Sequence, residues 1–136
     1  MDHEYGVFPE GTQWVLQDMQ LDNGVHISNY ASDAPPGLNQ PMKSNATILG
    51  ADGVSTFVDT VTTPLNPLWM SQDGRTYFLE WQVEIPGPPA ASFRVTSLTA
   101  DQELTGESPA YEGVARVFGT MDGQPVMGTA WSEQVL

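Results

Sequence analysis

The chain has 136 residues, of which 40% are hydrophobic, and it carries 17 acidic against 4 basic residues, a formal net charge of −13. This length suffices for one core, so a single domain over residues 1–136 is predicted. The negative charge would repel nucleic acid and anionic lipid. No apolar run is long enough to insert into a membrane. The absence of cysteine excludes disulfides, a thiol nucleophile and thiolate metal sites.

In chain order, the first half of the sequence predicts strands joined by tight turns. Strands are expected at "TQWVLQDMQL" and "VHISNY", with a turn at Asp22-Asn23-Gly24 between them. The Pro/Gly-rich stretch "ASDAPPGLNQPMKS" is a predicted loop. "NATILG" and "VSTFVDTVTT" flank the turn Ala51-Asp52-Gly53, and the prolines of "PLNPLW" predict an irregular segment.

The second half gives the clearest strand, "TYFLEWQVEI", which follows a turn at Asp73-Gly74. Apolar residues at every second position predict an antiparallel strand with one core face and one solvent face. "PGPPAA" ends it, because proline cannot donate to a strand ladder. "SFRVTSLTA" and the polar loop "DQELTGESPA" follow, and "YEGVARVFGT" and "QPVMGTAWSEQV" form a last hairpin around Met121-Asp122-Gly123.

These segments predict an all-β, antiparallel up-and-down barrel of about eight strands, with a two-sheet sandwich as the alternative. A barrel of this strand number either holds one small apolar ligand or fills its interior with side chains.

Two carboxyl groups near aromatic residues are candidates for chemistry. If the Trp131 side of the last strand faces inward, Glu133 lies at the barrel mouth beside an aromatic ring. There its pKa would rise and it could donate a proton; the alternative is a solvated carboxylate on the rim. Glu112, between Tyr111 and Gly113, presents the same choice between a chemical and a structural role.

The N-terminal residues "MDHEYG" are a weaker signal. Asp2 and His3 are adjacent, so on an extended segment their side chains point to opposite faces. The spacing has no specificity for a metal, and neither a metal site nor a cofactor is predicted. The sequon Asn45-Ala46-Thr47 would accept a glycan if the chain were exported, so the sequence leaves its compartment open.

Six motifs occur in an order that resembles the C-terminal half of the hydroxyneurosporene synthase-like proteins. The motifs are "MDHEYG", "LQDMQLDNG", "YFLEWQVEIP", "ADQEL", "YEGVARVFG" and "GQPVMGTAWSEQ". That group includes carotenoid 1,2-hydratases, AttH, kievitone hydratase and fungal lipocalin-like Diels–Alderases. The resemblance implies two lipocalin-like barrels in tandem with a hydrophobic substrate in a cleft between or within them, of which this chain resembles only the second. It departs from the pattern at Ala110-Tyr111, where an aromatic pair is usual.

The resemblance also implies roles for individual residues. Asp2 and His3 match the family's Asp-His element, and with Glu133 they are the expected catalytic residues. In hydratase-like members, such a carboxyl group would protonate an alkene and water would capture the cation. The aromatic residues expected to bind the substrate or shield that cation are Tyr5, Trp14, Trp81, Tyr111 and Trp131.

The expected function is therefore hydration of an isoprenoid or polyketide-derived polyene, or its cyclisation by a Diels–Alder-type cycloaddition, in which the protein mainly shapes the reactant. The expected partners are this hydrophobic small molecule and either a first lipocalin-like half or a second copy of the chain. The alternatives are a non-catalytic carrier of an apolar molecule and a structural half-domain whose partner does the chemistry.

Overall fold

Nine strands form in the part of the chain that the computed structural model describes, residues 11–32, 37–106 and 109–136. They are β1 (Trp14–Leu21), β2 (His26–Ser32), β3 (Met42–Leu49), β4 (Ser55–Met70), β5 (Thr76–Ile85), β6 (Ala91–Ser97), β7 (Glu103–Leu104), β8 (Ala110–Met121) and β9 (Gln124–Val135). None of these described residues forms a helix that could cross a membrane.

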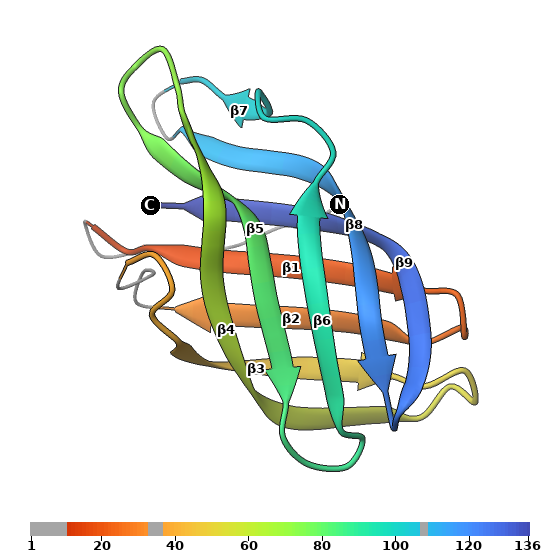
Figure 1. Cartoon of the computed structure of the whole chain (residues 1–136). Coiled ribbons are helices and arrows are strands. Elements are labelled where there is room, and N and C mark those ends of the chain that lie inside the picture. The colour runs from red at the N-terminus through yellow and green to blue at the C-terminus, as the bar shows by residue number, and fades with distance from the viewer. Residues whose placement is uncertain (1–10, 33–36, 107–108) are drawn as a thin grey trace.

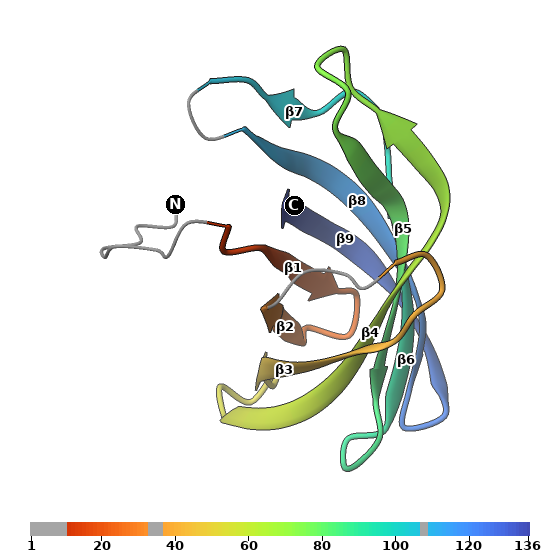
Figure 2. The same ribbon diagram turned by 90° about the vertical axis from the view of Figure 1, so that its left-hand side faces the viewer.

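Eight of these strands close into an antiparallel barrel (Figures 1 and 2). Each strand from β1 to β5 pairs with the next in sequence; β1 also pairs with β9, and β9 with β8. The ladder between β6 and β8 closes the ring, and β7 is a two-residue addition to the other end of β8. The predicted all-β barrel of about eight strands is confirmed.

The four predicted turns each join two antiparallel neighbours. Gly24 has a φ of +82° and Gly123 a φ of +76°, which is the left-handed region that glycine adopts without a steric cost. Because the turn between β8 and β9 is only two residues long, it fixes the register of the whole hairpin, from Met121 opposite Gln124 to Tyr111 opposite Gln134.

The prediction that "PLNPLW" is irregular is wrong, because β4 continues through both prolines to Met70. The pairing of β4 explains why it tolerates them: β3 pairs with it only as far as Thr62, and β5 pairs with it from Val61 onward. Pro64 and Pro67 therefore lie where one edge of the strand is unpaired, and there a missing N–H costs nothing. The register shifts between Leu65 and Leu68.

The interior of the barrel is filled by its own side chains. Phe78 and Trp81 pack edge to face with ring centroids 5.3 Å apart, and Phe93 is fully buried. Gln134 reaches from β9 to β5, where its Oε1 accepts from the Phe78 N–H at 3.0 Å and its Nε2 donates to the Phe78 carbonyl at 2.8 Å. The core thus connects strands that are not neighbours in the sheet.

A belt of buried polar side chains crosses this interior from β1 to β4. Asn29 Nδ2 donates to Gln17 Oε1 at 2.7 Å and to Thr62 Oγ1 at 3.0 Å. Thr60 Oγ1 donates to Asn29 Oδ1 at 2.6 Å and is joined to Ser44 Oγ by a second hydrogen bond of 2.6 Å. Hydrogen bonds of this kind offset the cost of burying polar groups, and they fix the relative positions of the strands.

Candidate active site

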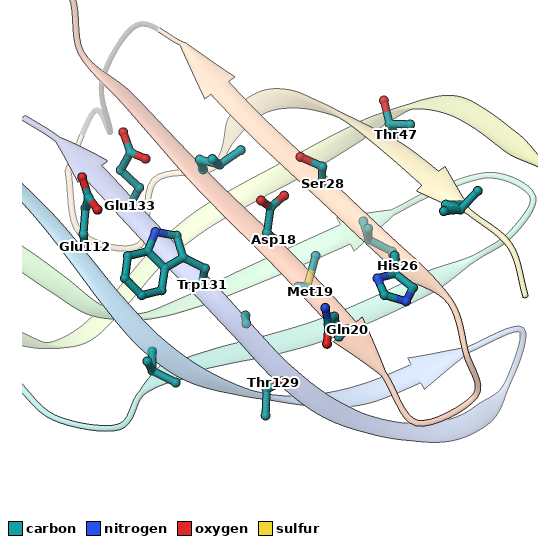
Figure 3. Close-up of a pocket in the computed structure, with 15 residues that line it drawn as sticks. Asp18, Met19, Gln20, His26, Ser28, Thr47, Glu112, Thr129, Trp131 and Glu133 are labelled. Atoms are coloured by element: carbon teal, nitrogen blue, oxygen red, sulfur yellow. The ribbon is translucent and has the colours of Figure 1, made fainter. Parts of the chain in front are cut away.

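A groove of about 930 Å³ lies on the outer face of the barrel wall, across β8, β9, β1, β2 and β3 (Figure 3). The side chains of Leu16, Asp18 and Gln20 on β1 point into it, while the alternate residues of that strand point into the barrel. We call this site the outer groove. Its volume is in the range of small-molecule sites.

Two glutamates face each other at one end of the outer groove. Glu112 on β8 and Glu133 on β9 are directly opposite in the ladder, so their Cβ atoms are about 5 Å apart. The Trp14 indole N–H donates to Glu133 Oε1 at 2.8 Å, which orients that carboxyl group. Like charges directly opposite each other destabilise a sheet, so this pair is a poor choice for stability alone.

Trp131 occupies the middle of the outer groove. It lies opposite Asp18 on β1 and Val114 on β8, two residues along β9 from Glu133. Its side chain is 41% exposed, and Figure 3 shows the indole on the same face of the wall as Glu112 and Glu133. An aromatic face beside carboxyl groups can stabilise a cation that forms next to it.

The other end of the outer groove has neutral polar groups and an imidazole. Gln20 lies opposite both His26 on β2 and Thr129 on β9. Ser28 lies opposite Asp18, and Thr47 lies opposite Ser28, so these two hydroxyl groups are level with Trp131 in the middle of the groove. The outer groove therefore has an acidic end, an aromatic centre and a hydrogen-bonding end.

The expectation that rested on an inward-facing Trp131 is not met, because the side chain lies on the outside of the barrel. Trp81 and Phe93 already fill the interior, and β9 turns its small residues Ala130 and Ser132 toward them. Glu133 is on the same face as Trp131 and so lies in the outer groove rather than at the barrel mouth.

The remaining predicted residues lie apart from the outer groove or outside the described residues. Trp81 is 1% and Tyr111 0% exposed, so both are core residues. The Tyr111 hydroxyl donates to the Thr99 carbonyl at 3.0 Å. Asp2, His3 and Tyr5 are outside the residues that the structure describes.

Asp18 and His26 are groove residues that the sequence reasoning missed. The alternation along β1 and β2 placed both on a solvent-facing side, but nothing in the sequence showed that this side is concave. The described residues hold no group of three or more His, Cys, Asp or Glu side chains that could bind a metal ion.

A smaller hollow of about 190 Å³ lies beside β7 and is lined by Trp69, Asp73 and Glu103, among others. Below it, the Tyr77 hydroxyl donates to Glu103 Oε1 at 2.8 Å, and Arg75 Nη1 is 3.6 Å from the same oxygen. Burial, together with the bond to Glu103 and its negative charge, raises the pKa of Tyr77 to about 12. These contacts attach β7 to β5.

We expect this tyrosine to make the folded protein less stable at high pH. Because the pKa of Tyr77 is higher in the folded than in the unfolded chain, its contribution is complete below pH 10.0 and is lost as the pH rises to about 12. Alkaline titration of tyrosinate absorbance should show one late step, which Tyr77→Phe removes. A titration of Tyr77→Phe that still shows this late step would contradict the assignment.

Comparison with known proteins gave matches only among solved structures; no protein-family model and no curated protein sequence matches the chain. Kievitone hydratase from Nectria haematococca matches with a TM-score of 0.78 and 30% identity over 90% of this chain. An AttH-like protein from Nitrosomonas europaea matches with a TM-score of 0.68 and 21% identity, also over 90%, and this second match shows the fold alone. The chain spans 39% of the first protein and 38% of the second.

Proposed function

The chain belongs to the lipocalin-like family that includes kievitone hydratase. On that premise, we propose that it adds water to a carbon–carbon double bond of an apolar substrate held in the outer groove. The likeness to a hydratase at 30% identity supports this class of reaction. The chain spans only 39% of kievitone hydratase, so hydration is an activity that we propose for this chain and not one carried over from the whole of that protein.

One observation carries the proposal: two carboxyl groups face each other beside an aromatic ring in a groove. Two carboxyl groups that reach the same substrate can divide the work of a hydration, one giving a proton and the other accepting one. Glu112 and Glu133 would thus present one acid and one base to the same substrate. Trp131 would lie against the apolar part of that substrate.

The proposed reaction needs only these groups and water. The protonated carboxyl group gives its proton to one alkene carbon, and the π electrons form the new C–H bond. The other carbon becomes a carbocation, which the face of Trp131 stabilises. A water oxygen then bonds to that carbon and loses a proton to the carboxylate.

A second lipocalin-like barrel, or a second copy of this chain, is proposed as the cover of the outer groove. The groove lies on the outside of the wall, where solvent competes for any cation that forms. Covering it would exclude this water and strengthen the electrostatic interactions within. The matched region is only 39% of kievitone hydratase, so that protein has additional chain from which such a cover can be formed.

The test is incorporation of oxygen-18 from labelled water. The chain is incubated with conjugated apolar alkenes, alone and with the separately produced unmatched part of kievitone hydratase, tested as the covering barrel. Products are analysed by mass. We expect a product heavier than the alkene by one labelled water, formed faster with the added barrel. Binding of the alkene without any label uptake in either mixture would contradict hydration and leave a carrier of apolar molecules.

A further inference from the structure

The outer groove differs in chemistry from one end to the other, and this difference bears on how a substrate lies in it. Glu112 and Glu133 form the acidic end, and Gln20, His26 and Thr129 form the opposite end (Figure 3). Trp131 lies between the two. The two ends therefore make different demands on a ligand.

The separation of the acidic end from the opposite end follows from the register of β9. Glu133 and Thr129 are four residues apart on this strand, which corresponds to about 13 Å at the usual rise per residue. The apolar side chains Leu16, Val114 and Trp131 line the groove between or beside these ends. A ligand that touches both ends is consequently elongated, with an apolar middle.

Charge separates the two ends further. Asp18, Glu112 and Glu133 line the acidic end and the centre, which disfavours an anionic group there. His26 and Gln20 can donate and accept hydrogen bonds. Arg116 on β8 lies opposite Thr129 and adds a positive charge beside this end, although it does not line the groove.

We propose that His26 and Gln20 bind the polar end group of an elongated, uncharged substrate and so direct its double bond toward Glu112 and Glu133. This inference rests on the proposed function and deepens it, because it names the class of substrate and its orientation. His26 is then a specificity-determining residue that does not touch the reacting carbons. The substrate carries a hydroxyl or carbonyl group at one end and its alkene at the other.

The test compares two linear probes, 9-decen-1-ol and 1-decene, which share a terminal alkene and differ by one hydroxyl group. Their affinities for the whole chain are measured by NMR titration of the Trp131 indole N–H. We expect the alcohol to bind about fivefold more tightly, the usual value of one hydrogen bond. Intermolecular NOEs should join the hydroxyl-bearing carbon to His26 and the alkene carbons to Trp131 and Glu133.

Variants at the polar end show whether these side chains cause the preference. His26→Leu and, independently, Gln20→Leu are expected to bring the two affinities together, whereas Gln124→Leu, an exposed change outside the groove, keeps the difference. Equal affinities in the original chain, a preference that survives in His26→Leu, or NOEs of the reverse orientation would overturn the proposal.

The binding result and the oxygen-18 result can fail separately. A preference for the alcohol without any hydration of conjugated alkenes would remove the proposed function and keep the orientation. Hydration without the preference would remove only the orientation.

Discussion

Replacement of Glu133 by glutamine is expected to lower the rate of water addition by about 10²–10⁴-fold, the usual contribution of a general acid or base. The amide keeps the size of the side chain and can still accept from the Trp14 indole, but it cannot deliver a proton. The rate of oxygen-18 uptake under single-turnover conditions measures the effect. Glu112→Gln should reduce the rate in the same way, because the two groups act as a pair.

Glu84→Gln is the matched control for this prediction. Glu84 is exposed on β5 and does not line the outer groove, so the change removes the same formal charge without touching the site. Its rate should equal that of the original chain. If the Glu133 and Glu112 variants also keep the full rate, the acid–base role is excluded, and a shape-directed reaction such as cyclisation becomes the explanation for any conversion.

Replacement of Gly128 by alanine is expected to lower the free energy of unfolding by about 3 kcal/mol, a large value for the addition of one methyl group. A Cβ atom at this position would overlap the carbonyl oxygen of Gln20 and lie 2.9 Å from its carbonyl carbon. Gly128 pairs with Leu21 in the ladder between β1 and β9, so neither backbone can move away without breaking that ladder. Urea unfolding measures the loss.

Gly87→Ala provides the comparison, since a Cβ atom there meets nothing within 4 Å. Its stability should stay within about 0.5 kcal/mol of the original chain. Equal unfolding midpoints for the two variants would contradict this prediction, because they would show that β1 and β9 can move apart at no cost in free energy.

Local sequence signals were sufficient to predict the strands and their hairpins, whereas a closed barrel and a two-sheet sandwich were both compatible with them. The turn glycines and the polar–apolar alternation predicted eight strands and their hairpins, because each hairpin is a contact between chain neighbours. The same signal could have predicted the Glu112–Glu133 pair. A two-residue turn at Asp122-Gly123 places these residues opposite each other once the register is counted back.

Which face of each strand points into the barrel was harder to predict, because this depends on which side chains fill the interior. The sequence left open whether Trp131 faces inward; in the structure, Trp81 and Phe93 from other strands occupy the interior. The outer groove itself depends on the ladder between β1 and β9, which joins Leu16 to Glu133 across most of the chain. No local pattern encodes that pairing.

The amide of Gln134 joins β9 to β5 across the interior of the barrel. Substitutions inside the barrel and substitutions on its outer face therefore differ in their effect on folding. A substitution that removed this amide would leave the buried N–H and carbonyl groups of Phe78 without these partners, which lowers the stability of the fold. Mutations on the exterior leave the amide intact. Substitutions in the outer groove therefore change its lining without removing this connection across the interior.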